Sequence, residues 1–329
     1  PRTRGMNVAV LVDPGTTNAP EIQSASKLLP ERRIFARKYS GHNANVRAVT
    51  NMVENFPYDF LVFATHCGDV SGYRCTYEFT DREGIDRRLV VDTAVGIART
   101  DDRNILRVCQ FTRFHELDGV DWTDSVAKRR LYVGTAIQDW IEREKEMRPV
   151  HRIGIDRVFG SAALAMADDN YLPMLRWIAN GKTPVILNNA CASWRELAGR
   201  FMFAGARAYI GTLIPVTSSE ASEVATRVLS KYFGQPLAYA VWAAQRTVYG
   251  KGPRRPYVVS GVYTQRLRST MEDAPKYIQQ RLRHGLAVWQ RKSAQASSEE
   301  HRRACEEYVR WFQTEFSLFQ RWHRDLKQL

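Results

Sequence analysis

Two short apolar runs constrain the fold of this chain more than any other feature. Residues 60–66 read Phe-Leu-Val-Phe-Ala-Thr-His, and residues 185–193 read Val-Ile-Leu-Asn-Asn-Ala-Cys-Ala-Ser. Neither run alternates apolar with polar residues, which indicates short strands that are buried on both faces. Such strands occur in parallel sheets that are covered by helices. The sequence therefore predicts an α/β fold around a mostly parallel sheet.

Strand-like and helix-like segments alternate around these two runs. Further strands are predicted at 7–12, 34–39, 206–213 and 257–262, and helices at 46–56, 193–204, 217–232 and 237–249. Two of the helices open on the Ser/Thr-x-x-Glu pattern of a capping box, from Ser193 and from Thr217. Together these segments predict a doubly wound sheet with helices on both faces.

The stretch between the two runs is longer than a helical crossover between neighbouring strands requires. Residues 77–122 are rich in strand formers, with strands predicted at 88–95 and 105–111 around a turn at 100–104, and 123–147 has helical periodicity. We divide the chain into a core of 1–66 and 161–267, a β-rich insertion at 67–160 and a helical appendage at 268–329. The insertion either gates or holds a substrate beside the crevice, or is ordinary decoration.

The C-terminal appendage contains no strand-like run, and helices are predicted at 274–292 and 298–327. Large side chains recur in the second helix at three- and four-residue spacing: Tyr308, Trp311, Phe312, Phe316, Phe319, Trp322 and Leu326. A stripe this aromatic has to be covered. It either docks against the protein's own core or contacts a regulatory domain or another subunit.

Each of the two runs contains, just after its apolar residues, a side chain that can take part in nucleophilic catalysis: His66 in the first and Cys191 in the second. Most His and Cys residues are structural, but the carboxyl ends of strands in an open α/β sheet face the ligand crevice. If the two strands are neighbours, His66 and Cys191 meet there. A helix is predicted directly after Cys191, and the N–H groups of a helix N-terminus stabilise a thiolate. The pair therefore indicates a peptidase-like dyad.

The residues around Cys191 resemble a known family. The strand that ends in Asn189-Ala190-Cys191, a helix of small residues, and the segment 204–213 followed by Pro215 and Val216 are similar to the CHAT domain, a caspase-like cysteine peptidase fold. The apolar strand ending in His66 is similar to the family's second signature. The resemblance covers about 57–66 and 183–262, is loose over 7–56 and hardly extends over 67–160.

The resemblance implies a caspase-like endopeptidase without metal or cofactor, in which His66 is the base and Cys191 attacks the peptide carbonyl. It implies an oxyanion hole made by backbone N–H groups of Cys191 and of Cys67 or Gly68. In the family Gly directly follows the His, whereas here Cys67 intervenes, and it would be strained if the loop needs a positive φ. Cys67 is otherwise either a small buried side chain or a redox partner of Cys191.

Two residues are candidates for substrate binding. In caspase-like peptidases the residue two positions before the catalytic Cys lines the pocket for the side chain that precedes the cut. Here it is Asn189, whose neutral amide favours Arg or Lys less than a carboxylate does. Asp69, just past the loop of His66, carries a carboxylate that can pair with a basic side chain, so a preference for Arg or Lys stays an alternative. The structural alternatives are that Asn189 hydrogen-bonds its own turn and that Asp69 caps a turn.

Composition argues against several classes of protein. The longest apolar stretches are far shorter than the roughly 18 residues of a membrane span, and no secretion-type segment follows the Arg-rich start, which predicts a cytoplasmic protein without membrane contact. Five irregularly spaced Cys argue against a disulfide framework and structural zinc. A net charge of +13 and a pI near 9.7 leave nucleic-acid binding open, although the charges are dispersed and no P-loop, RNP or zinc-finger motif occurs.

The sequence thus predicts a cytoplasmic cysteine endopeptidase that cleaves a specific protein partner. Family resemblance implies regulated cleavage within bacterial defence or cell-death circuits. Two alternatives stay open: a catalytically weak interaction module with the same fold, and a basic module that binds nucleic acid.

Overall fold

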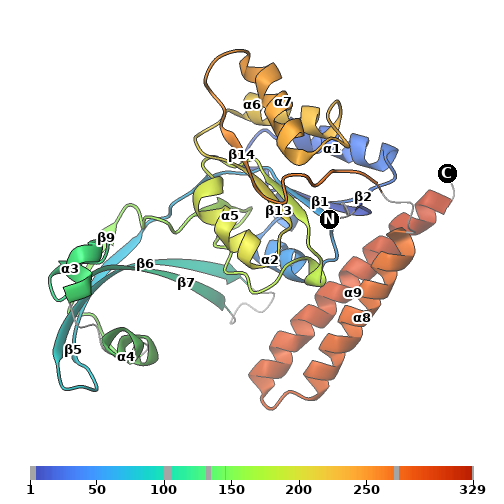
Figure 1. Cartoon of the computed structure of the whole chain (residues 1–329). Helices are drawn as coiled ribbons and strands as arrows, with labels where there is room; N and C mark the ends of the chain where they lie inside the picture. The colour runs from blue at the N-terminus through green and yellow to red at the C-terminus, as the bar shows by residue number, and fades with distance from the viewer. Residues whose placement is uncertain (1–4, 100–105, 131–134, 145, 270–273, 328–329) are drawn as a thin grey trace. The chain divides into compact units, whose positions relative to one another are not determined.

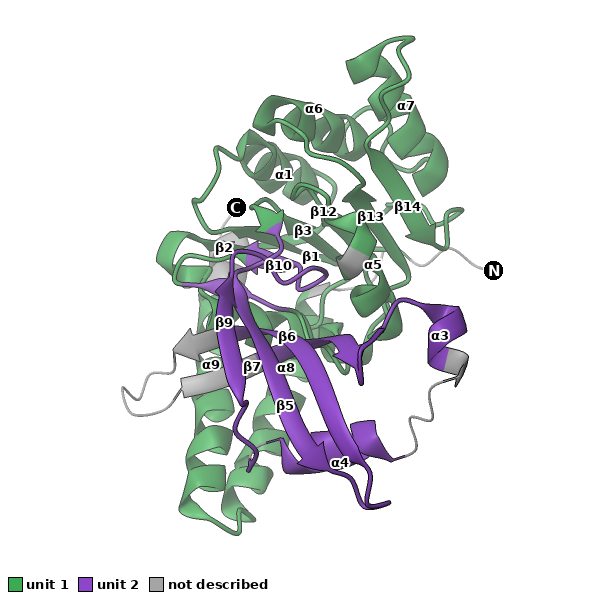
Figure 2. Cartoon of the chain, turned by 90° about the vertical axis from the view of Figure 1, so that its left-hand side faces the viewer, with its two compact units in different colours: residues 1–67, 165–168, 173–329 green, residues 68–164, 169–172 purple. Residues whose placement is uncertain are grey.

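The computed structural model describes residues 5–99, 106–130, 135–144, 146–269 and 274–327. The chain forms two compact units, shown in Figure 2. Unit 1 comprises residues 1–67, 165–168 and 173–329, and unit 2 comprises residues 68–164 and 169–172. Unit 1 thus contains the C-terminal helices together with the central sheet, and unit 2 corresponds to most of the segment between the two apolar runs.

A six-stranded sheet forms the centre of unit 1 (Figure 1). Its order is β14-β13-β12-β3-β1-β2, and its strands are β1 Val8–Asp13, β2 Phe35–Ser40, β3 Phe60–Phe63, β12 Val185–Asn188, β13 Ala208–Thr212 and β14 Tyr257–Gly261. All neighbours pair in parallel except β13 and β14, which are antiparallel. Every residue of β3 and β12 is buried, as their continuous apolar sequences require. The predicted α/β class with a mostly parallel sheet is confirmed.

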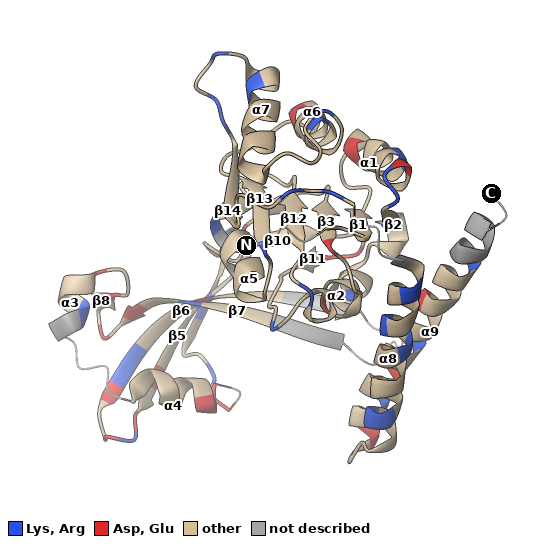
Figure 3. Cartoon of the chain, turned by 45° about the vertical axis from the view of Figure 1, so that its right-hand side comes forward, with Lys and Arg blue, Asp and Glu red and all other residues tan. Residues whose placement is uncertain are grey.

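Helices cover both faces of this sheet, as Figure 3 shows. The helices are α1 Pro20–Glu31, α6 Ser218–Leu229 and α7 Leu237–Tyr249 on one face, and α2 Val46–Asn55 and α5 Trp194–Phe203 on the other. On the first face Ile22, Val224 and Val241 belong to one buried cluster with the strands. On the second face Phe201 of α5 contacts Phe63 and stacks on Tyr209. Short 3-10 turns occur at η1 Gly41–Asn43 and η2 Ala179–Gly181.

One of the two predicted capping boxes is confirmed and the other is wrong. At the start of α6 the amide of Glu220 donates to the Thr217 hydroxyl at 3.2 Å, and the amide of Thr217 donates to the Glu220 carboxylate at 2.8 Å. At the start of α5 the Ser193 side chain does not cap the helix. It donates to the Asn188 carbonyl at 3.1 Å and accepts from the amide of Thr212 at 3.3 Å. Ser193 therefore ties the end of β12 to β13, because a partner from a neighbouring strand competes with the local cap.

The C-terminal helices α8 Ala274–Ala294 and α9 Glu299–Lys327 form a hairpin (Figure 1). Phe312 and Phe319 of α9 are buried, and Phe319 meets the ring of Phe35 in β2 edge to face. A Cβ at Gly285 of α8 would lie 2.3 Å from the Phe312 ring, so this glycine permits close approach of the two helices. The described part of the aromatic stripe therefore packs within unit 1, while the side chains of Trp322 and Leu326 lie outside the described residues.

Unit 2 is built on an antiparallel sheet with the order β8-β7-β6-β5-β9. Its strands are β5 Gly72–Thr80, β6 Asp86–Arg99, β7 Leu106–Leu117, β8 Val120–Asp121 and β9 His151–Ile155, and its helices are α3 Ser125–Arg130 and α4 Ala136–Arg143. Trp140 of α4 packs against Tyr77 and Phe114. The predicted strands at 88–95 and 105–111 lie on β6 and β7, although residue 105 and the predicted turn at 100–104 lie outside the described residues.

Three short strands form a further sheet with the order β11-β10-β4. They are β4 Cys67–Gly68, β10 Ala163–Ala165 and β11 Asn170–Tyr171. Within the described part of the chain, no helix combines the length and the apolar character needed to cross a bilayer.

Candidate active site

His66 and Cys191 lie just beyond the carboxyl ends of two central strands, β3 and β12. Because these strands are parallel neighbours, both residues are at the same end of the sheet. The two strands pair Phe63 with Asn188, and the amide of Asn189 donates to the Phe63 carbonyl at 2.9 Å. His66 comes three residues after Phe63, and Cys191 comes three residues after Asn188. The two candidates therefore occupy matching positions beyond the ends of paired strands. Both belong to unit 1.

The loop that carries Cys191 is held by hydrogen bonds on both sides. The side-chain oxygen of Asn188 accepts from the amide of Ala190 at 3.0 Å. From β13 the hydroxyl of Thr212 donates to the Ala190 carbonyl at 2.8 Å. Because the groups that make these bonds are buried, the loop is fixed immediately before the thiol.

The residue after Cys191 has an uncommon backbone conformation. Ala192 has φ +51°, in the left-handed region, where a residue with a Cβ costs roughly 1–3 kcal/mol. Cys191 therefore lies on a sharp turn between a strand end and a helix, with its side chain half-buried. The strain considered for Cys67 does not occur, because the φ of Cys67 is not positive.

The Cys191 thiol and the His66 imidazole are each hydrogen-bonded to a backbone carbonyl and not to one another. The thiol donates to the carbonyl of Val216 at 3.4 Å, and Nε2 of His66 lies 3.1 Å from the carbonyl of Thr16. A carbonyl only accepts, so this bond assigns the proton to Nε2 and leaves Nδ1 as the basic nitrogen of the neutral ring. The hydroxyls of Thr16 and Thr65 are 3.1 Å apart and join the loop after β1 to the loop after β3. Thr16 thereby orients the imidazole.

The predicted oxyanion donors Cys67 and Gly68 lie on a short strand rather than in an open loop. They form β4, and just before it the carbonyl of His66 accepts from the amide of Ala165 at 3.0 Å. Cys191 takes part in no disulfide, so a redox partnership with Cys67 stays a prediction.

Asn189 belongs to a buried polar network. Its side-chain amide donates to the Glu21 carboxylate at 3.1 Å and to the Ala221 carbonyl at 3.3 Å, and its oxygen accepts from the Tyr257 hydroxyl at 3.1 Å. The substrate-binding role predicted for Asn189 has no support in these contacts, which favour a structural role. The predicted structural alternative is that Asn189 hydrogen-bonds its own turn. The structure shows instead that Asn188 makes this bond, to the amide of Ala190.

Asp69 has its partners within unit 2. Its carboxylate accepts from Nε of Arg157 at 2.6 Å and from the amides of Gly160 and Ala162 at 3.0 and 3.2 Å. Only 8% of its side chain is exposed. These contacts favour the structural alternative, in which Asp69 caps a turn, and do not favour the substrate-binding role.

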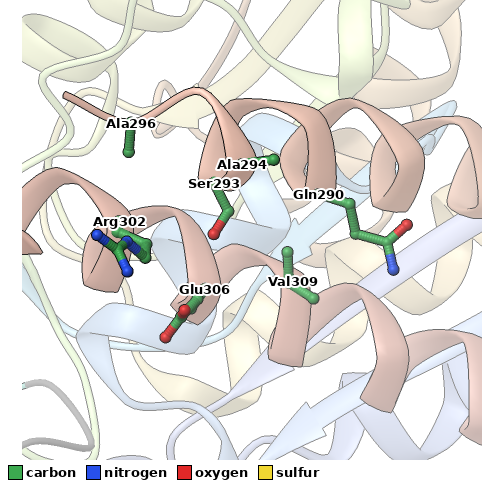
Figure 4. Close-up of a pocket in the computed structure, with 7 residues that line it drawn as sticks. All are labelled: Gln290, Ser293, Ala294, Ala296, Arg302, Glu306 and Val309. Carbon is green, nitrogen blue, oxygen red and sulfur yellow. The ribbon is translucent and has the colours of Figure 1, made fainter.

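Two cavities lie away from these residues. One, of about 370 Å³, lies between α8 and α9 and is lined by Gln290, Ser293, Ala294, Ala296, Arg302, Glu306 and Val309 (Figure 4). The other, of about 300 Å³, lies on the sheet of unit 2 and is lined by Tyr73, Cys75, Tyr77, Thr93, Val95, Gln110, Glu144, Pro149 and Arg152. Among the described residues, no three His, Cys, Asp or Glu side chains are grouped as a metal ion would require.

Comparison with known proteins gives no match. No protein-family model matches this chain, and no curated protein shows significant sequence similarity to it.

The buried carboxyl group of Glu21 is expected to make the free energy of unfolding depend on pH. Burial raises the pKa of its carboxyl group and nearby Asp13 adds to this, while hydrogen bonds from its own amide and from Asn189 partly oppose the rise. A carboxyl group with a raised pKa in the folded state stabilises the fold below its unfolded pKa, and this contribution is lost as pH rises through the folded pKa. We expect Glu21→Gln, which can still accept from Asn189, to remove this loss and to be more stable than wild type at neutral pH.

Urea unfolding in acidic buffer near the ordinary Glu pKa of about 4.3 and at neutral pH measures this effect. Glu31→Gln, an exposed change on the same helix, should follow the wild-type pH dependence. An equal difference between Glu21→Gln and wild type at both pH values would contradict the assignment.

Proposed function

We propose that this chain is a caspase-like cysteine endopeptidase of the CHAT type, with His66 as general base and Cys191 as nucleophile. The observation that carries the proposal is the register of β3 and β12, which sets the two residues at matching positions on one edge of the sheet. The resemblance of the Cys191 region to the CHAT domain supplies the peptidase class. The same resemblance also implies that the substrate is a specific protein, that the enzyme is cytoplasmic, and that it acts in bacterial defence or cell death.

The sharp turn at Cys191 supports this function. Backbone strain at a non-glycine residue persists only where the surrounding structure fixes it, and it often occurs at active sites. Ala192 has such strain directly after the proposed nucleophile. The bonds from Asn188 and Thr212 hold the turn, so the thiol is carried on a rigid loop.

The proposed reaction transfers protons through the imidazole. Nδ1 of His66 accepts the thiol proton, and the Cys191 thiolate attacks the peptide carbonyl carbon to give a tetrahedral oxyanion. Collapse of this intermediate breaks the C–N bond, and the imidazolium protonates the departing amine. Water, deprotonated by His66, then hydrolyses the thioester and releases the acid. The Cys191 thiol must first leave the Val216 carbonyl, an exchange of partners that substrate binding would drive.

Alkylation with an iodoacetamide probe tests the proposed activation of Cys191. The thiolate is the reactive form, and burial raises the pKa of the Cys75 and Cys305 thiols, so these two should react slowly. We expect Cys191 to be labelled on the order of tenfold faster than either, with the preference lost in His66→Ala. Mass spectrometry of peptides identifies the labelled thiol.

His42→Ala serves as the matched control, because His42 is also exposed but lies on η1. It should label as wild type does. Labelling spread evenly over the accessible thiols, or unchanged by His66→Ala, would instead favour a catalytically weak interaction module with this fold.

A further inference from the structure

Helix α8 carries a concentration of positive charge with no acidic residue. Its 21 residues contain the five cations Lys276, Arg281, Arg283, Arg291 and Lys292, and neither Asp nor Glu. All five are exposed. Figure 3 shows Lys and Arg in blue along α8 and α9.

Three acidic residues of neighbouring α9 pair with residues outside α8. Glu307 pairs with Arg47 at 3.2 Å and Glu315 pairs with Arg37 at 2.8 Å, so two of its carboxylates bind the core of unit 1. Glu299 pairs within α9, with Arg302 and Arg303 at 3.3 and 3.1 Å. These carboxylates all have partners other than α8.

Four cations of α8 contact rings or backbone instead of carboxylates. Arg281 lies over the ring of Tyr277 at 5.5 Å, Arg283 over Phe316 at 5.4 Å and Lys292 over Trp289 at 4.2 Å, and Nε of Arg291 donates to a backbone carbonyl. In the part of the chain that the structure describes, none of these four forms an ion pair. Stacking uses the flat face of a guanidinium and leaves its N–H edges available, so the donors of Arg281 and Arg283 are held in place for an anion.

The outer face of α8 suits a polyanion better than a protein or a bilayer. Lys276, Arg283 and Arg291 are spaced by seven and eight residues, so they lie on one face about two turns apart, roughly 11 Å along the axis. The exposed residues between them are Gln280, His284, Ala287 and Gln290. A protein interface needs a buried aromatic or aliphatic anchor and a membrane-surface helix needs a large apolar face, and this face offers only an alanine.

We propose that α8 binds the phosphodiester backbone of nucleic acid, without regard to base sequence. Phosphates are ionised at every pH of interest and repeat along the strand, so they match a row of cations that lacks apolar anchors. Arg283 and Arg291 on the outer face are the central contacts. The proposal is independent of the peptidase activity.

Fluorescence anisotropy with the full chain tests this site. The probes are a labelled DNA duplex of about two helical turns and a single-stranded RNA of matched length, titrated at about 50 to 200 mM salt. For three to four phosphate contacts on the duplex, log K should fall with log salt with a slope of about −3. We expect R283Q/R291Q to reduce the steepness of this slope by about 2, because each lost phosphate contact removes about 0.9. Binding of either probe with this loss supports the proposal.

The double variant K231Q/R246Q is the matched control. Lys231 and Arg246 are also exposed and stacked on rings, those of Tyr232 and Trp242, but they lie outside the hairpin. It removes the same charge and should keep the wild-type slope. The proposal is overturned if R283Q/R291Q and K231Q/R246Q have the same effect, if wild type binds neither nucleic acid, or if acidic phosphatidylserine vesicles bind while both nucleic acids do not.

Discussion

Replacing Cys191 by alanine is expected to abolish peptide-bond cleavage. The thiolate forms the covalent intermediate, and loss of a nucleophile typically lowers turnover on the order of 10⁴-fold or more. His66→Ala should have a loss of similar size, because the dyad acts as a unit. The measurement is the appearance of a fragment when proteins encoded nearby are incubated with wild type and with each variant.

Cys67→Ala is the control for this experiment. It removes a second half-buried thiol next to His66, yet the proposed oxyanion donor at this position is a backbone N–H, which alanine keeps. Cys67→Ala should therefore retain cleavage. Cleavage that survives in Cys191→Ala, or is lost equally in Cys67→Ala, would contradict the assignment of the nucleophile.

The sheet of unit 1 could be predicted from the sequence because its central strands are buried on both faces. Continuous apolar runs such as those of β3 and β12 are stable only inside a sheet that is covered on both faces. The apolar pattern does not determine which strands are neighbours, and the structure shows that these two pair. The sequence pattern does not predict helix α1, because this helix begins on Pro20 and contains Pro30 in its last turn. In unit 2, β9 has four exposed residues out of five, so hydrophobic pattern could not identify it.

The surroundings of the candidate site depend on contacts between distant parts of the chain, which local patterns do not contain. Asn189 sits two residues before Cys191, but its partners come from α1, α6 and β14. The orientation of His66 by the Thr16 carbonyl also requires the loop after β1. The predicted capping box at Ser193 is wrong for the same reason, because the competing amide of Thr212 lies 19 residues further along the chain.

Replacing Glu315 by alanine is expected to destabilise the protein by about 3–5 kcal/mol. Glu315 is 3% exposed, and its two carboxylate oxygens accept from Nε and from a terminal nitrogen of Arg37 at 2.9 and 2.8 Å. Burial alone would lower the pKa of Arg37, but the hydrogen bonds and charge of Glu315 outweigh it and raise that pKa. Without the carboxylate a charged guanidinium is left uncompensated between β2 and α9. The free energy of unfolding from urea titration measures the loss.

Two further variants separate the buried charge from the packing of α9. Glu300→Ala removes an exposed carboxylate from the same helix and should change stability by less than about 0.5 kcal/mol. R37M/E315L removes both charges and fills similar volume, so it should recover most of the stability lost in Glu315→Ala. If the double variant is as unstable as the single one, the loss comes from packing and not from an uncompensated charge. A loss below about 1 kcal/mol in Glu315→Ala would show that this contact does not hold α9 against the edge strand β2.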